Sequence, residues 1–148
     1  MKIQRAGSED LHEILALQYL AYQSEAKLFA NKKIPPLTQT LPEVEQEFQK
    51  GIILKVCEDD AIIGSVRAHC TNGTVFIGKL IVHPEKQGQG IGTKLLLAIE
   101  QEYPAQRYEL FTSTKSKRNI ALYERLGYRI FKETRLTEEL SFVYLEKV

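Results

Sequence analysis

The chain has 148 residues, 43% of them hydrophobic, which is enough for one core and leaves no room for a second domain. Its 20 basic and 19 acidic side chains give a net charge of +1, and this balance excludes the strongly basic surface of a nucleic-acid-binding protein. The charge balance favours a small-molecule partner. No apolar run approaches the roughly 18 residues of a membrane span. No apolar leader follows the first Met and the chain has two cysteines, so we expect a cytoplasmic protein.

The N-terminal quarter predicts a short strand, a helix and a loop. The strand covers Lys2 to Ala6, and Ser8 is a suitable N-cap for a helix that runs to the neighbourhood of Leu28. Residues 31 to 39 include two prolines, whose missing N–H groups end a helix. We expect this segment to be a loop.

The next segment predicts a short helix followed by an antiparallel meander. Thr40 to Glu43 matches a capping box, and Gly51 is placed to end the helix. Alternating apolar and polar residues then predict three strands, namely Ile52 to Cys57, Ala61 to Cys70 and Thr74 to Val82. Asn72-Gly73 is a strong hairpin signal between the last two. The register pairs Cys57 near Ile62, so we expect two buried free thiols and no disulfide.

The C-terminal third predicts a mixed sheet. A helix that ends before Pro104 leads to a strand at Arg107 to Thr112, which this helical crossover makes parallel to its predecessor. The remaining predicted elements are a helix from Ser116 to Leu126 stopped by Gly127, and an antiparallel pair of strands at Tyr128 to Glu133 and Ser141 to Glu146.

A glycine-rich turn separates the strand ending at Val82 from the following helix. Gly88, Gly90 and Gly92 allow a ligand to approach the backbone, and the free N–H groups at the start of the helix favour phosphate oxygens. No glycine stands directly before Lys-Ser or Lys-Thr, so the turn is not a P-loop. Thr93 occupies the place of the third glycine of a dinucleotide fingerprint, so that motif fits poorly.

The pattern Q-x-x-G-x-G, formed by Gln87, Gly90 and Gly92, resembles the pyrophosphate-binding motif of the GNAT superfamily of acyl-CoA-dependent N-acetyltransferases. The lead-in V-H-P-E-K at 82–86 is similar to that family too, as is the segment N-I-A-L-Y-E-R-L-G-Y from Asn119 to Tyr128. The resemblance implies one α/β (α+β) domain over residues 1–148, with a central mixed, mostly antiparallel sheet of about six or seven strands and about four flanking helices.

The resemblance also implies a site for acetyl-CoA as cosubstrate, with no metal. The strand before the turn supplies backbone groups for the pantetheine arm, and the turn holds the diphosphate. The implied cofactor-binding residues are Leu80, Ile81, Val82, Gln87, Gly88, Gln89, Gly90, Ile91, Gly92, Thr93, Asn119 and Tyr123.

Catalytic roles follow from the same resemblance. Tyr123 is expected to be the general acid that protonates the leaving thiolate, because a phenol with a pKa of about 10 is protonated at neutral pH. Many relatives use a Glu base early in the preceding strand, but Val75-Phe76-Ile77 has no carboxylate. His69 on the neighbouring strand is the remaining side-chain candidate, and water-mediated deprotonation is favoured over it.

The resemblance therefore implies direct transfer of an acetyl group to a primary amine in a ternary complex. The acceptor is left open among a polyamine, an amino acid, an aminoglycoside-like compound and a protein N-terminus, with a small molecule favoured over a protein. Two other hypotheses stay open, a non-catalytic acyl-CoA-binding or regulatory module and a nucleotide-binding protein. A homodimer is possible on this sequence.

Overall fold

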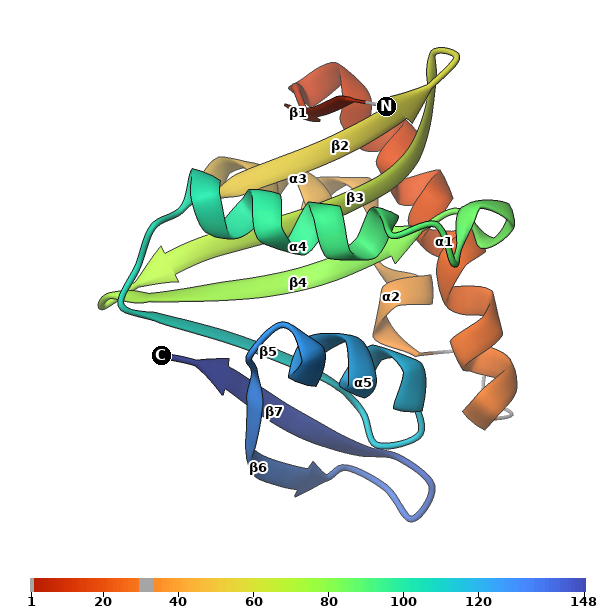
Figure 1. The fold of residues 1–148 in the computed structure, drawn as a ribbon. Coiled ribbons are helices and arrows are strands. Elements are labelled where there is room, and N and C mark those ends of the chain that lie inside the picture. Colours follow the sequence, from red (N-terminus) through yellow and green to blue (C-terminus); the bar gives the residue numbers. More distant parts are fainter. Residues whose placement is uncertain (1, 30–33) are drawn as a thin grey trace.

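A seven-stranded sheet forms the centre of the computed structural model, which describes residues 2–29 and 34–148 (Figure 1). The strands are β1 (Lys2–Arg5), β2 (Ile52–Glu58), β3 (Ala61–Thr71), β4 (Thr74–Val82), β5 (Arg107–Ser113), β6 (Arg129–Arg135) and β7 (Ser141–Lys147), in the order β1-β2-β3-β4-β5-β7-β6. The helices are α1 (Leu11–Phe29), α2 (Pro35–Thr38), α3 (Leu41–Lys50), α4 (Ile91–Glu102) and α5 (Lys117–Arg125). The predicted α/β fold is confirmed.

The antiparallel meander of β2 to β4 forms as its turn residues predict, and β1 pairs with the outer edge of β2. Asp59 and Asp60 adopt positive φ angles of 51° and 67°, and Asn72 and Gly73 adopt 51° and 81°. Two consecutive residues at positive φ give the turn whose twist matches that of the flanking strands. Both predicted hairpins are therefore confirmed.

The parallel partner of β4 is β5, and their pairing is short. It covers only three pairs, the last of which joins Phe76 to Glu109. Beyond that pair the two strands diverge, and β5 continues alongside β7 on its other edge. The final strand pair is antiparallel as predicted, with β7 inserted between β5 and β6.

Helices cover both faces of the sheet. On one face α1 and α3 close an apolar cluster around Ile14, Val44 and Ile53, and on the other α4 closes a second cluster around Leu95 and Ile99. Figure 1 shows α4 and α5 in front of the sheet and α1 and α3 behind it. The face covered by each helix decides which side of the sheet its polar residues can reach.

Two predicted helix boundaries need correction. The first helical turn is a 3₁₀ segment, η1 (Ser8–Asp10), whose N-cap is Gly7 and not Ser8. The Asp10 carboxylate accepts a hydrogen bond of 2.8 Å from the Gly7 N–H, so the acid caps the helix from inside. The loop predicted at 31–39 contains the four-residue α2, because proline is accepted in the first turn of a helix. Residues 31–33 lie outside the described part.

The capping box of α3 is confirmed. The Glu43 N–H donates to Thr40 Oγ1 at 3.4 Å, and the Thr40 N–H donates to Glu43 Oε1 at 2.9 Å. Gly51 follows as the C-cap. The helix is thus fixed at both ends by local sequence.

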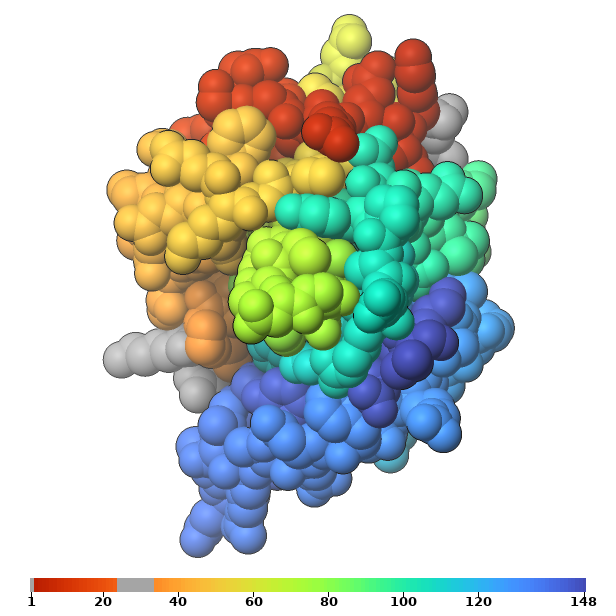
Figure 2. Space-filling view, turned by 90° about the vertical axis from the view of Figure 1, so that its left-hand side faces the viewer, coloured from red at the N-terminus to blue at the C-terminus, as the bar shows by residue number. Residues whose placement is uncertain are grey.

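The β3–β4 hairpin tip projects from the end of the molecule where β4 and β5 pair. Figure 2 looks onto this end, with the yellow-green tip between the α3 side and α4. Cys70 lies near the tip and is exposed, so the prediction that it is buried is wrong. Cys57 is half-buried opposite Ile62, as the register predicted, and both thiols are free. Within the described residues no helix is both long and apolar enough to cross a membrane.

Candidate active site

A cavity of about 670 Å³ opens where β4 and β5 part. Its described walls come from β4 (77–82), β5 (110–113), the α5 segment (115–119 and Tyr123), the α1–α2 side (Ala21, Tyr22, Ile34, Pro35 and Pro36), Gln87, Leu140 and Phe142. The cavity therefore reaches from the α4–α5 face of the sheet to the α1–α2 side.

A β-bulge helps to separate the two strands. The pairing of β3 with β4 shifts by one residue between Ser65 opposite Ile81 and Arg67 opposite Gly78. Lys79 in the bulge has a positive φ of 48°. Because a bulge bends its strand and increases the twist, β4 changes direction here, just beyond its last pair with β5 at Phe76. The edge of β4 that faces the opening then needs another partner for its backbone groups.

Leu80, Ile81 and Val82 line this opening, as their predicted role requires. The Ile81 side chain is buried against α1 and α3, so only the backbone edge is available to a ligand. An extended pantetheine arm fits such an edge because it can be bound like an added strand.

The glycine-rich turn lies at the start of α4. Gly88 and Gly90 both adopt a φ of 81°, a conformation that favours glycine. Gly90 is the N-cap of α4, and no side chain caps the first N–H groups of this helix. An uncapped helix start backed by the helix dipole is suited to a diphosphate.

The predicted turn residues differ in their surroundings. Gln87 lines the cavity, and residues 88–90 are exposed beside it. The Ile91 side chain is only 3% exposed and packs in the core, so its possible ligand contact is through the backbone. Gly92 and Thr93 are half-buried in the first turn of α4.

Basic residues at the start of α5 extend the anion-binding surface. Arg118 Nη1 donates to Gln87 Oε1 at 3.0 Å, which holds the guanidinium next to the glycine turn. Lys115 and Lys117 line the same end of the cavity. These residues were not predicted from the sequence, although the basic run K-S-K-R before Asn119 is the signal that marks them.

Tyr123 and Asn119 both line the cavity, one turn apart on α5. Tyr123 is 6% exposed, and its ring centroid lies 6.2 Å from that of Tyr128. Tyr128 does not line the cavity, and its hydroxyl donates to Glu100 Oε2 at 2.6 Å. Burial raises the pKa of Tyr128 far above its ordinary value, and the Glu100 carboxylate adds to this effect.

His69 lies outside the cavity. It is exposed, pairs with Phe76 across the β3–β4 hairpin and stacks on that ring at 5.3 Å. Phe76 also pairs with Glu109 of β5, so His69 lies at the end of the sheet where β4 and β5 are still paired. The geometry does not support the base role considered for His69, and we do not retain it.

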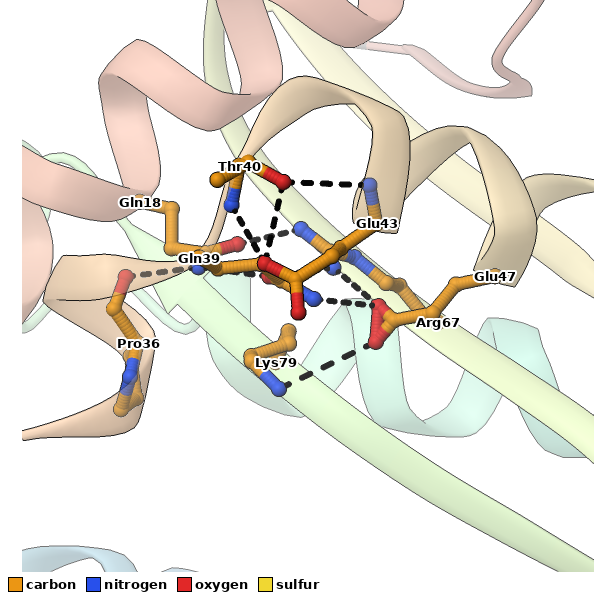
Figure 3. Close-up of polar contacts among 8 residues, drawn as sticks. All are labelled: Gln18, Pro36, Gln39, Thr40, Glu43, Glu47, Arg67 and Lys79. Carbon is orange, nitrogen blue, oxygen red and sulfur yellow. Dashed lines mark hydrogen bonds and ion pairs between the residues drawn. The ribbon is translucent and has the colours of Figure 1, made fainter.

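A buried polar cluster lies beside the cavity, on the face of the sheet that α1 and α3 cover (Figure 3). Arg67 in β3 has a side chain 6% exposed, and its Nη1 contacts Glu47 Oε2 in α3 at 2.6 Å. Its Nη2 donates to Gln18 in α1, and Gln39 bridges Gln18 and Glu47 with bonds of 2.9 and 3.0 Å. This cluster was not predicted from the sequence, in which an arginine within the apolar strand was the available signal.

Lys79 extends this cluster towards the cavity. Its Nζ lies 4.0 Å from Glu47 Oε1, and its side chain is 24% exposed. Burial lowers the pKa of the Lys79 ammonium, with Arg67 adding to the effect and Glu47 opposing it. In the part of the chain that the structure describes, no group of three or more His, Cys, Asp or Glu side chains is placed to hold a metal ion.

Comparison with known proteins places the chain in a family. The family model of the acetyltransferase (GNAT) domain matches residues 49–130, more than half of the chain. The chain is 25% identical over 118 residues to the UPF0157 protein YqkA of Bacillus subtilis (strain 168). That match covers 79% of this chain and 34% of the relative, so the chain spans about a third of the length of that protein.

Solved structures share the fold. The ribosomal-protein-S18-alanine N-acetyltransferase of Escherichia coli superposes with a TM-score of 0.82 at 15% identity, covering 99% of this chain and 92% of that one. A putative acetyltransferase of Salmonella typhimurium, solved with its cofactor acetyl-CoA, gives 0.75 at 17% identity over the same shares. These structures show the shared fold, and the family-model match over more than half of the chain shows that it belongs to the GNAT acetyltransferase domain family.

Proposed function

We propose that this chain, as one N-acetyltransferase domain over residues 1–148, transfers an acetyl group from acetyl-CoA to a primary amine by direct transfer in a ternary complex. The observation that carries the proposal is the parting of β4 from β5 after Phe76 and Glu109, which opens one cavity onto the backbone of 80–82 and onto Tyr123. Acetyl-CoA supplies the acetyl thioester, and the chain supplies a path through the sheet to an acceptor.

The described residues fit the cofactor. The start of α4 and the Arg118 guanidinium provide positive ends for the diphosphate, and the free edge of β4 provides backbone groups for the arm. The N–H groups along this edge are also suited to stabilising negative charge on a carbonyl oxygen. The same residues therefore serve binding and polarisation.

Proton transfer is divided between one side chain and solvent. The reaction forms a C–N bond and breaks the C–S bond, so the sulfur needs a proton and the amine must lose one. Tyr123 is the proposed donor to the sulfur, because this residue lines the cavity next to Asn119 on α5. None of the described lining residues is Asp, Glu or His, so we assign removal of the amine proton to water.

The test is release of free thiol from acetyl-CoA in the presence of a panel of primary amines. We expect turnover with at least one amine, and a rise in Tm with CoA but not with NAD or ATP, because a ligand of the native state stabilises it. Stabilisation by CoA without thiol release would favour the non-catalytic acyl-CoA-binding module. Stabilisation by NAD or ATP instead would overturn the proposal.

A cytoplasmic location and a homodimer also remain proposals. Sedimentation of the purified chain tests the second, with a mass of twice 16.9 kDa expected for the dimer.

A further inference from the structure

Lys79 places a positive charge on the α1–α2 side of the cavity, which we call the acceptor side because the glycine turn proposed to hold the cofactor lies at the other end. It is the only charged residue that β4, α1 and α2 contribute to the described lining. The basic residues of α5 and the Arg118 contact with Gln87 belong to the glycine-turn end. Lys79 instead points towards Glu47 on α3, as Figure 3 shows. The two ends of the cavity therefore present separate positive charges.

The charge of Lys79 is only partly balanced by protein groups. Glu47 is the one described carboxylate within 4.0 Å of its Nζ, and Glu47 Oε2 already accepts hydrogen bonds from Arg67 and Gln39. The 4.0 Å separation from Oε1 is too long for a hydrogen bond. One carboxylate is thus shared by two cations, and the three donors of the ammonium are not taken up by it.

An anion in the cavity would complete this arrangement. Burial works against the charged form of Lys79, and a carboxylate bonded to it would restore that form. A cationic group would instead meet a second positive charge in a partly desolvated wall. Acceptors with several ammonium groups, such as polyamines and aminoglycosides, are therefore disfavoured.

The position of Lys79 limits the distance between the anion and the reacting amine. Lys79 directly precedes the 80–82 edge, where the acyl arm is proposed to lie. In an α-amino acid the carboxylate and the amine are attached to the same carbon atom. A carboxylate bound at Lys79 would accordingly hold the amine close to that edge.

Apart from Lys79, the described residues that line this side carry no charge and are mostly apolar. Tyr22, Ile34, Pro35 and Pro36 line the cavity, and Ile34 packs with Tyr22 and Leu140. Such walls suit an apolar side chain and offer little to a polar one.

We propose that Lys79 binds the carboxylate of the acceptor, and that the acceptor is an amino acid or amino-acid-like amine with an apolar side chain. This inference rests on the proposed acetyl transfer and names its substrate class. Lys79 acts here as a specificity-determining residue.

The test compares L-phenylalanine with 2-phenylethylamine, which differ by the carboxylate alone, in the thiol-release assay with the full chain. We expect kcat/KM to favour phenylalanine by about 10- to 100-fold, as for one hydrogen bond between charged groups. Lys79→Met should remove this preference by lowering kcat/KM for phenylalanine only. Lys79→Arg should retain part of the preference for phenylalanine. Lys50→Met is the control, because it removes the same charge at an exposed position, and it should leave the preference unchanged.

Two results would overturn the inference while leaving acetyl transfer intact. One is equal use of both amines by the unchanged chain. The other is an equal loss of kcat/KM for both amines in Lys79→Met, as expected for a general base.

Binding supplies a readout that needs no turnover. With CoA present, N-acetyl-L-phenylalanine should bind more tightly than N-acetyl-2-phenylethylamine, and Lys79→Met should abolish the difference. Equal calorimetric affinities would also overturn the inference, whereas absence of CoA binding would instead count against the proposed function.

Discussion

The two sides of the cavity are built in different ways. On the α4–α5 side, the glycine turn, the start of α4 and Arg118 lie within 32 residues of one another along the chain, from Gln87 to Arg118, and much of the binding surface is backbone. On the other side Lys79 is the member of the polar cluster that lines the cavity. Behind it Arg67 meets Gln18 across 49 positions and Glu47 across 20, and the cluster is made of side chains. Backbone sites are encoded by local patterns, whereas side-chain clusters depend on packing.

We expect the two sides to bind different molecules. A backbone site tolerates many side chains and is suited to a cofactor that many relatives share. A side-chain cluster can change with a few substitutions, so it is suited to the acceptor, which distinguishes one acetyltransferase from another. The predictions below test whether the two sides separate in this way.

The largest expected effect is on catalysis by Tyr123. We expect Tyr123→Phe to lower kcat by about 10² to 10⁴ while CoA affinity stays nearly unchanged, because only the proton donor is lost. Thiol release and calorimetry measure the two quantities. Tyr128→Phe is the matched control, since this buried tyrosine is a ring neighbour outside the cavity, and it should lose stability through its bond to Glu100 but keep kcat. An unchanged kcat in Tyr123→Phe would remove the acid role.

The next effect is on stability through the buried cluster. Arg67→Met leaves Gln18 and Glu47 without their buried donor, so we expect the free energy of unfolding to fall by about 3 kcal/mol. Urea denaturation measures it. Arg5→Met breaks an exposed ion pair with Glu102 and should cost under about 1 kcal/mol. Similar costs for the two variants would show that the cluster contributes no more than a surface pair.

A glycine pair tests the cofactor side. Gly90 and Gly73 share a φ of 81°, and both have open space where the methyl group of an alanine would lie, so an alanine should strain both backbones alike, by about 1 kcal/mol. Only Gly90→Ala places that methyl group at the start of α4, and we expect it to raise the KM for acetyl-CoA by about tenfold. Gly73→Ala should leave this KM unchanged. Equal KM values would place the diphosphate elsewhere.

The smallest effect concerns the cap of α1. Burial by itself raises the pKa of Asp10, but hydrogen bonds from Lys55 and Gly7 outweigh it, so the pKa lies below its ordinary value of 3.8. A carboxyl with a lowered folded pKa stabilises the fold above the unfolded value and loses this contribution as the pH falls through the folded value. Asp10→Asn should therefore cost about 1 kcal/mol at pH 7 and flatten the loss of stability between about pH 5 and 2.

Chemical denaturation at several pH values provides the measurement, with Asp59→Asn in the exposed hairpin turn as the control. A pH dependence that is the same in Asp10→Asn and in the unchanged chain would contradict the role of this carboxylate. Asp10 does not line the cavity, so both acceptor and cofactor kinetics should be unaffected.

Local sequence determined the elements and the glycine turn proposed to bind the cofactor. Asn72-Gly73, the Thr40 to Glu43 box and the turn at 87–92 each act through backbone angles or hydrogen bonds over a few residues, so their structures followed from the chain alone. The helix start at Gly7 was misread because Asp10 caps it from a later position.

Tertiary structure decided which side chains lie at the end of the cavity away from the glycine turn. His69 was a reasonable base by residue type, but the strand register places it at the paired end of β4 and β5. Arg67, Glu47 and Lys79 meet through the packing of α3 on the sheet and the bulge in β4, which no motif in the sequence marks. Packing between distant segments is a property of the whole chain, so the charge of the acceptor side became visible only once the chain was folded.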